Sequence, residues 1–311
     1  MENIEMRQVL QETVAELMKE DERIVVLDAD LAKAVGTTAL HKAFPSRSYN
    51  MGIAEANMVS VAAGLSTYGF IPLTFTFAPF ASRRCCDQVA LSVCFAKSNV
   101  KLFGGDPGVT AQINGATHMG NDDIGVLRSI PDLVIFEPSD PVMMKKLLPA
   151  LIRYEGPVYT RLLRKKAEPV YSDDATFDLF RIETVRPGSD VTLAASGILM
   201  AAALRAADML AEDGVSAEVL DVHTIKPLDT ATLIASLQKT GAAVACENHS
   251  VIGGLGSAVA EAAAKECPVP MEFIGVQDHF GQAADQAYLL EKYHMTDKDI
   301  AAAAKRAMER K

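Results

Sequence analysis

The sequence contains no tryptophan, no surplus of basic residues and no long hydrophobic run. The net charge of −10 argues against a nucleic-acid-binding role, because contact with a phosphate backbone requires a basic face. No apolar run reaches the ~18 residues that a membrane-spanning helix requires, and residues 1–7 carry no signal-peptide pattern. These absences predict a cytoplasmic protein that acts on neither nucleic acid nor membrane. The lack of tryptophan excludes no function.

Cysteine is scarce as well. The chain has five, an odd number, and their spacing is not that of metal ligands. We therefore expect the reduced thiols of a cytosolic protein rather than a disulfide framework. The five are Cys85, Cys86, Cys94, Cys246 and Cys267.

The length and the composition are those of a soluble protein with two domains. At 311 residues the chain exceeds the usual size of one domain. Hydrophobic residues make up 49% and charged residues 23%, which is normal for a chain that buries large cores.

Strand-like and helix-like segments alternate along most of the chain, which predicts an α/β fold with parallel sheets covered on both faces. The pattern lapses in a polar stretch with turn residues, which predicts a linker. We expect a first domain at 1–168, a linker at 169–188 and a smaller second domain at 189–311. The expected strands are 24–30, 71–77, 100–103, 133–136 and 158–161, then 190–195, 217–222, 242–247 and 271–276.

Glu55 opens an apolar, alanine-rich run that is typical of a buried helix. A carboxylate in a first helical turn has two interpretations. It either favours the positive end of the helix dipole from a solvated position, or it is held away from water and shares a proton with a ligand. The motif by itself leaves both open.

A glycine-rich turn, Gly-Gly-Leu-Gly-Ser at 253–257, precedes a predicted helix. Backbone amides at such a point can bind phosphate. The stretch lacks the full dinucleotide spacing and the P-loop lysine, so a tight strand-to-helix turn is the favoured interpretation.

Several spaced motifs, taken together, resemble transketolase, and more narrowly the C-terminal subunit of a transketolase that is split into two chains. They span nearly the whole chain, and their order makes the resemblance far more specific than any one of them. The motifs are Gly-Ile-Ala-Glu at 52–55, Thr-Phe-Ala-Pro-Phe at 76–80, Asp-Gln at 87–88, Asn-Gly-Ala-Thr-His at 114–118, Ile-Lys-Pro-Leu-Asp at 225–229, Glu-Asn-His at 247–249 and Asp-His-Phe-Gly at 278–281.

The resemblance implies a pyrimidine-binding domain for thiamine diphosphate (TPP) followed by a transketolase C-terminal domain. The family's third domain binds the diphosphate and the metal through a Gly-Asp-Gly…Asn motif, which the sequence does not contain. We therefore expect no metal site in this chain, and an N-terminal partner subunit that holds Mg²⁺ or Ca²⁺. Two copies of each chain would form an α2β2 heterotetramer.

The resemblance also implies residues for the cofactor. Glu55 matches the glutamate that binds the aminopyrimidine ring, a role that requires a buried carboxyl. Phe77 and Phe80 match the aromatic pair beside that ring, although their spacing alone would suit core residues. Asp30 and Leu31 match a further contact with the cofactor, for which helix capping is the alternative. Arg83 stands where many members have another polar contact.

On the substrate side, His118 matches the family's catalytic histidine, which would relay protons to and from the sugar. Arg7 and Arg161 match two arginines that bind the substrate phosphate, and a guanidinium suits bidentate contact with an anion.

Three positions depart from the family pattern around the sugar. Asn114 replaces an aspartate that contacts a substrate hydroxyl, and Ala34 replaces a serine near the phosphate. Asp106 occupies a position that is often histidine, where an acid would repel a phosphate. The resemblance thus predicts ketol transfer, with a ketose donor that is phosphorylated or otherwise anionic and an aldose acceptor.

Three other functions remain open. The β subunit of a 2-oxo-acid dehydrogenase shares the fold but usually carries His-Ser near His118. Deoxyxylulose-phosphate synthase is one long chain and has arginine where Phe80 stands. A non-catalytic TPP-fold protein would not need Glu55, both phenylalanines and His118. We therefore expect the C-terminal subunit of a transketolase.

Overall fold

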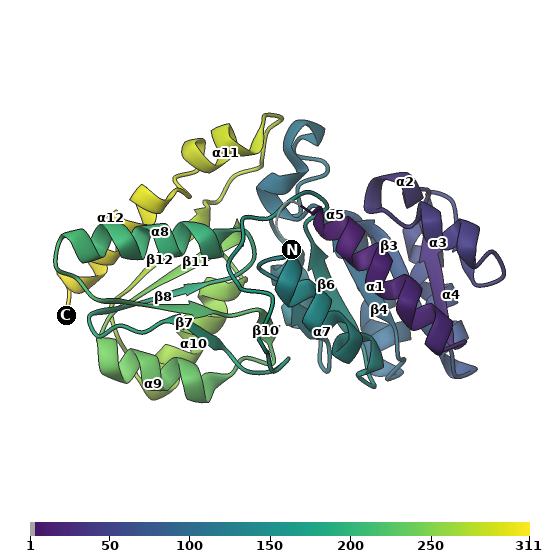
Figure 1. Ribbon diagram of the computed structural model, residues 1–311, viewed down its shortest axis with the longest axis horizontal. Helices are drawn as coiled ribbons and strands as arrows, with labels where there is room; N and C mark the ends of the chain where they lie inside the picture. Colours follow the sequence, from purple (N-terminus) through teal and green to yellow (C-terminus); the bar gives the residue numbers. More distant parts are fainter. Residues whose placement is uncertain (1–3) are drawn as a thin grey trace.

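The computed structural model describes residues 4–311 and contains two α/β domains that lie side by side (Figure 1). The first is built on a sheet with the strand order β10-β5-β6-β4-β3-β1-β2, and the second on a sheet with the order β12-β11-β8-β9-β7. The predicted two-domain α/β fold is confirmed. The strands of the first sheet are β1 (Ile24–Asp28), β2 (Ser48–Asn50), β3 (Ile71–Phe77), β4 (Lys101–Gly105), β5 (Val134–Phe136), β6 (Val158–Leu162) and β10 (Thr224–Lys226).

Helices cover both faces of the first sheet. Helices α1 (Met6–Glu20) and α7 (Pro141–Arg153) pack together on one face, and α4 (Glu55–Thr67) and η2 (Gln88–Phe95) pack on the other. Because neither face meets water, a strand such as β3 is buried along its whole length. The short helices of this domain are α2 (Ala32–Val35), α3 (Thr38–Ala43), α5 (Ala78–Ala81), η1 (Arg83–Cys85), η3 (Gly108–Asn114) and α6 (Asp123–Arg128).

The second sheet is also sandwiched between helices. Helices α8 (Leu199–Glu212) and α12 (Asp297–Met308) cover one face, and α9 (Thr230–Thr240) and α10 (Leu255–Glu266) cover the other. Helix α11 (Gln286–Lys292) reaches back towards η3 of the first domain. The strands are β7 (Glu183–Arg186), β8 (Val191–Ala195), β9 (Ala217–Asp221), β11 (Ala243–Ser250) and β12 (Met271–Val276).

The two domains are joined more closely than the predicted linker suggests. Strand β7 lies inside the predicted linker, 169–188, and pairs antiparallel with β9, so the second sheet begins within that segment. Strand β10 follows β9 in the chain but pairs antiparallel with β5 of the first sheet. The second domain therefore contributes an edge strand to the first, which holds the two domains in a fixed arrangement.

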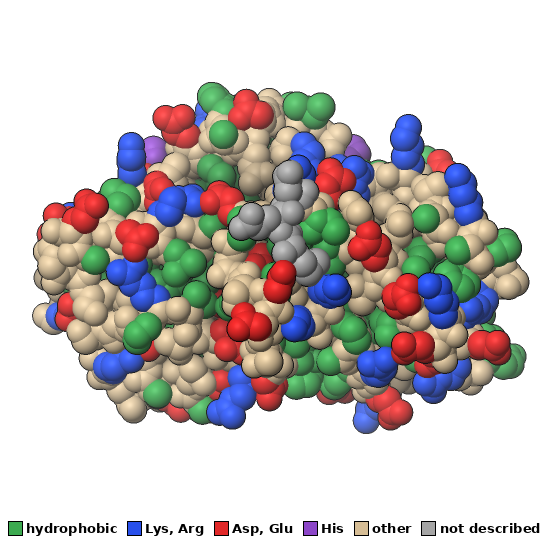
Figure 2. Space-filling model, in the orientation of Figure 1, with side chains coloured by type: hydrophobic (Ala, Val, Ile, Leu, Met, Phe, Trp, Pro, Cys, Tyr) green, Lys and Arg blue, Asp and Glu red, His purple; other side chains and the backbone are tan. Residues whose placement is uncertain are grey.

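The surface charges, the helices and the cysteines agree with what the amino-acid composition predicts. Acidic and basic side chains are interspersed over both domains on the face shown in Figure 2. Among residues 4–311, no helix combines the length and the apolarity needed to cross a membrane. The five cysteines are free thiols, and burial raises the pKa of Cys85 and of Cys94 to about 12.

Candidate active site

Glu55 is the first residue of α4, and its side chain is buried, with 2% of the residue exposed. Gly52, with φ +70, lets the chain turn sharply between β2 and α4, so that the carboxyl points inward at the edge of the sheet. Its partner is Arg84, whose Nη1 donates to Glu55 Oε1 at 2.7 Å. The solvated interpretation of Glu55 does not hold in this structure.

Arg84 marks a place for a flat, hydrogen-bonding group beside Glu55. Its guanidinium lies over the ring of Phe80, with Cζ 3.9 Å from the ring centroid, while it donates to Glu55. A planar group stacked on an aromatic face and hydrogen-bonded to a buried carboxyl shows that this place suits a flat ring such as an aminopyrimidine. The side chain of Arg84 is 46% exposed, so solvent already reaches the guanidinium that occupies this place. The residues present therefore fit the pyrimidine half of TPP.

Phe77, Phe80 and His118 form an aromatic cluster next to this place. The two phenylalanine rings meet edge to face at 6.1 Å, and the His118 ring lies 5.4 Å from Phe77 and 5.2 Å from Phe80. His118 Nδ1 contacts Thr117 Oγ1 at 2.9 Å. The half-buried imidazole therefore has one nitrogen with a partner on its own loop and a ring position set by the two phenylalanines.

The loop that carries His118 is supported by the second domain. Gly281 lies so close to this loop that a Cβ there would come within 2.1 Å of Met119 Sδ. A Cβ on Gly115, which has φ +75, would be 3.5 Å from Ala283 Cβ. The 278–281 motif therefore helps to position the histidine loop.

Two guanidinium groups lie close together at the edge of the first sheet where its strands have their C-terminal ends. Arg7 Nη1 and Arg164 Nη1 both donate to the carbonyl oxygen of Ala34, at 3.1 and 3.3 Å. Arg164 also lies over the ring of Phe77 at 4.9 Å, and its Nε donates to Asp106 Oδ2 at 2.6 Å. Ligands of parallel α/β sheets bind outside the carboxyl ends of the strands. This cluster is thus placed to bind an anionic end group near the aromatic residues.

The prediction that Arg161 binds the substrate anion is wrong. Arg161 lies within β6, is 1% exposed, and donates to Asp123 Oδ2 (2.9 Å), Glu137 Oε1 (2.6 Å) and the carbonyl of Asn248 (2.9 Å). Burial alone would lower the pKa of Arg161, but the two carboxylates raise it above its ordinary value. Its donors are occupied inside the protein. Arg164, two residues beyond the end of β6, is the arginine that reaches the edge.

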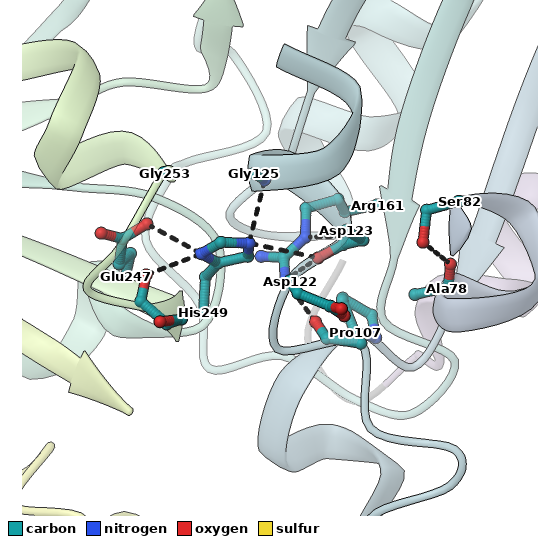
Figure 3. A network of polar contacts seen from close by, with 12 residues as sticks. Ala78, Ser82, Pro107, Asp122, Asp123, Gly125, Arg161, Glu247, His249 and Gly253 are labelled. Carbon is teal, nitrogen blue, oxygen red and sulfur yellow. Dashed lines mark hydrogen bonds and ion pairs between the residues drawn. The ribbon is translucent and has the colours of Figure 1, made fainter. Parts of the chain in front are cut away.

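Arg161 belongs to a buried polar network that joins the domains (Figure 3). Burial would raise the pKa of Asp123, but Arg161 brings it below the usual range. Burial also lowers the pKa of His249 to about 4. The neutral imidazole accepts from the Gly125 amide through Nε2 at 3.2 Å and contacts the Ser250 carbonyl through Nδ1 at 2.7 Å. The sequence motif at 247–249 thus holds the second domain against α6.

The glycine-rich turn at 253–257 is structural. Glu247 Oε2 and Oε1 accept from the amides of Leu255 and Gly256 at 2.7 and 2.9 Å. A Cβ on Gly254 would come within 2.0 Å of Glu247 Oε2, so the turn requires glycine. Burial raises the pKa of Glu247 to about 7, although the amides act against the shift. A protein carboxyl already occupies this helix end, in agreement with the tight-turn interpretation.

The remaining predicted residues lie around the rim. Asp30, with φ +60, accepts from Asn50 Nδ2 at 2.9 Å and is followed by half-buried Leu31. Arg83 pairs with Asp122 at 3.3 Å, and Asn114 is exposed at the end of η3. Within residues 4–311, no group of three or more His, Cys, Asp or Glu side chains is placed to hold a metal ion.

The sequence reasoning missed Arg84 and Arg164. Arg84 follows Arg83 in a short 3-10 helix, where either side chain could face the site. Arg164 lies just past the carboxyl end of a predicted strand, which is the position from which a side chain reaches the ligand edge of a parallel sheet. The preference of ligands for the C-terminal ends of parallel strands could therefore have identified Arg164, rather than Arg161, as the arginine near the ligand.

Comparison with known proteins agrees with this geometry. The transketolase pyrimidine-binding domain family matches residues 2–169, and the transketolase C-terminal domain family matches residues 181–300. The 6-deoxy-6-sulfo-D-fructose transketolase subunit SqwH of Clostridium sp. (strain MSTE9) is 47% identical over 98% of this chain and 95% of its own. A 1-deoxy-D-xylulose-5-phosphate synthase of Heliobacterium modesticaldum is 36% identical over 96% of this chain but 46% of its own.

A solved structure described as a split gene transketolase, inactive beta4 tetramer, has a TM-score of 0.92 and 43% identity. It covers 99% of this chain and 100% of its own. The domain order, the relatives of matching length and the arrangement around Glu55 all agree, and the chain belongs to the transketolase family, as a subunit with the pyrimidine-binding and C-terminal domains.

Proposed function

We propose that this chain is the C-terminal subunit of a two-chain, TPP-dependent transketolase. It would transfer a two-carbon ketol unit from a ketose with an anionic end group to an aldose. The observation that carries the proposal is the buried Glu55 carboxyl, which holds a planar cation against Phe80. A buried carboxyl beside an aromatic face, next to a guanidinium that solvent reaches, is placed to bind a flat polar ligand.

When bound, TPP supplies the nucleophilic carbon that adds to ketose carbonyls. Glu55 would hold a proton on its carboxyl oxygen against a ring nitrogen, in the place that Arg84 now fills. Phe80 would cover one face of the ring and exclude water from the carboxyl. His118, oriented by Thr117 and by the two phenylalanines, would accept and return a proton of the sugar at Nε2.

Arg7 and Arg164 would bind the far end of the donor. Both donate to the carbonyl oxygen of Ala34, so the two guanidinium groups lie close together at this edge of the sheet. The relative SqwH is named for a sulfonated ketose, and a sulfonate, like a phosphate, is an anion that guanidinium groups recognise.

A partner subunit would complete the site. The solved relative of the same length is described as an inactive beta4 tetramer, which supports a need for a second kind of chain. Ile53, two residues before Glu55, is 76% exposed, and Ile113 on η3 is 79% exposed, as befits residues that a partner covers. We propose an α2β2 assembly in the cytoplasm, in which the N-terminal subunit holds the diphosphate and Mg²⁺ or Ca²⁺.

The experiment compares Glu55→Gln with Glu266→Gln, an exposed glutamate at the end of α10. Both variants are purified with the N-terminal subunit, and ketol transfer and TPP binding are measured separately. We expect Glu55→Gln to lose roughly 10²–10⁴-fold in turnover, the range for a lost acid–base group, and the control to lose nothing. Normal turnover in Glu55→Gln would refute the proposal. Condensation of pyruvate with an aldose phosphate, without ketol transfer, would favour a deoxyxylulose-phosphate synthase activity instead.

A further inference from the structure

Positive and negative charges balance in the group of side chains around Arg7 and Arg164, which lies where the strands of the first sheet have their C-terminal ends. Arg7 and Arg164 supply two positive charges, and each already has a carboxylate partner. Glu5 Oε2 accepts from Arg7 Nε at 2.7 Å, and Asp106 Oδ2 accepts from Arg164 Nε at 2.6 Å. The four side chains sum to zero, because two guanidinium groups face two carboxylates. Lys165 lies nearby in the chain, but its ammonium is bound to Gln112 Oε1 at 2.9 Å.

The two carboxylates differ in exposure. The side chain of Glu5 is 35% exposed, so water screens its charge. Asp106 is 1% exposed, and its Oδ1 also accepts from the backbone amide of Arg164 at 3.1 Å. The negative charge of Asp106 therefore lies against the Arg164 guanidinium, and burial and two hydrogen bonds hold it there.

A fixed charge at this point distinguishes between anions. A phosphomonoester carries about −1.5 to −2 at pH 7, with a second pKa of about 6. A sulfonate carries a single negative charge throughout the ordinary pH range. One extra unit charge at about 6–8 Å from a carboxylate, in an effective dielectric of about 20, changes affinity by about 10- to 100-fold.

We propose that Asp106 is a specificity-determining residue, and that it selects a donor with a monoanionic sulfonate end over one with a dianionic phosphate end. The inference rests on the proposed function and names the substrate class of the same site. Asp106 acts through Arg164 and through its own charge. It orients the guanidinium, cancels part of its field, and leaves enough positive potential for one negative charge but not for two.

A purely structural role for Asp106 makes a different prediction. The residue has φ +46, a conformation that aspartate and asparagine both tolerate, and it holds the backbone of Arg164. Asp106→Asn keeps the shape, the backbone conformation and an oxygen acceptor for Arg164, and removes the charge. If the residue only supports the loop, this substitution leaves the choice between donors unchanged.

The test uses the complex with the N-terminal subunit, TPP and Mg²⁺. The donors are 6-deoxy-6-sulfo-D-fructose and fructose 6-phosphate, with one aldose acceptor. The wild type is expected to favour the sulfonate by at least about tenfold in kcat/KM at pH 7.5. In Asp106→Asn this ratio falls by about tenfold, through a lower KM for the phosphate donor. Asp208→Asn, at an exposed aspartate on α8, is the matched control and keeps the wild-type ratio.

A second measurement needs no substitution. Between pH 7.5 and 5.5 the phosphate becomes a monoanion while the sulfonate is unchanged, so the wild-type ratio should narrow several-fold. The charged groups that face the end group are Arg7, Arg164, Glu5 and Asp106, and these face both donors alike. His118 acts on the reacting end, which is the same in both donors, so its contribution to the two rates cancels in the ratio.

Each outcome decides something. Ketol transfer with a preference for phosphate, or an identical ratio in Asp106→Asn and Asp208→Asn, overturns the inference and leaves the proposed function intact. A wild-type ratio that does not narrow at low pH also overturns it, and this holds even if Asp106→Asn fails to fold. No transfer from either donor refutes the proposed function, and with it the inference.

Discussion

Replacing Arg161 with methionine tests whether this arginine holds the domains together or binds substrate. The side chain is fully buried and neutralises two buried carboxylates, Asp123 and Glu137. It also donates to the carbonyls of Asn248, at 2.9 Å, and of Gly120, at 3.4 Å. Methionine fills most of the volume but leaves both carboxylates without a cation. Removing one partner of a buried ion pair typically costs about 3–5 kcal/mol, so we expect a loss of this size.

The assay measures the free energy of unfolding of the isolated chain in urea, with unfolding monitored by circular dichroism. Arg153→Met is the control, since its ion pair with Glu20 is solvent-exposed on both sides and should contribute below about 1 kcal/mol. A triple variant, Arg161→Met with Asp123→Asn and Glu137→Gln, removes the unpaired charges as well. It should recover much of the lost stability, because uncharged groups cost far less to bury.

The opposite result would restore the role that the sequence suggests. If Arg161→Met unfolds at the wild-type urea concentration, the buried network does not carry the stability assigned to it. If it also raises KM for an anionic donor and spares a neutral analogue, the guanidinium must reach the substrate. The structure predicts neither of these two results, because Arg161 is 1% exposed and its donors are bound inside the protein.

Two further predictions concern the cofactor place and the response to pH. Arg84→Ala removes a guanidinium that competes for Phe80 and Glu55, so TPP should bind the complex about 3- to 10-fold more tightly by calorimetry, and weaker binding would contradict this. Burial raises the pKa of Asp221 to about 7 in the folded chain, from an ordinary value of 3.8. Between these two pH values the folded chain keeps a proton on Asp221, whereas the unfolded chain has lost it. The resulting stability is present at acidic pH and is lost as pH rises to about 7, by at most about 1.4 kcal/mol per pH unit. Asp221→Asn should flatten this dependence in urea unfolding between about pH 4 and 7, and an unchanged slope would refute the assignment. In the slope that remains, Glu247 acts in the same direction as Asp221, while buried His249, whose pKa is lowered to about 4, adds stability as pH rises.

Much of the architecture followed from local patterns. Strands buried on both faces read as short apolar runs, and the expected strand at 71–77 coincides with β3. The burial of strands on both faces also made it hard to see which arginine reaches the surface, Arg161 or Arg164. In β6 all five residues are buried, so no alternation of apolar and polar residues shows which side chain leaves the core. Arg161 stays inside with Asp123, and Arg164 emerges only because the strand ends at Leu162.

Strand β10 shows a second limit of local reasoning. Its three residues carry too weak a pattern to be assigned, and their pairing with β5 depends on how the whole second domain is placed. The linker predicted at 169–188 contains β7 for the same reason, because β7 becomes a strand only through its pairing with β9. Edge strands obtain their hydrogen bonds from partners that lie far away in the sequence.

The sequence by itself determined the family and the two α/β domains, and it pointed to Glu55 as the candidate central carboxyl, because these depend on short motifs and on periodicity. Only the tertiary structure decided which charges face one another. Asp106 and Arg164 are 58 residues apart and meet at 2.6 Å, and Arg84 reaches Glu55 across 29 residues. The strength of an ion pair depends on distance and burial, which a linear pattern does not contain. The charge balance of the anion site, and hence the choice of substrate that we propose, arises only from the folded chain.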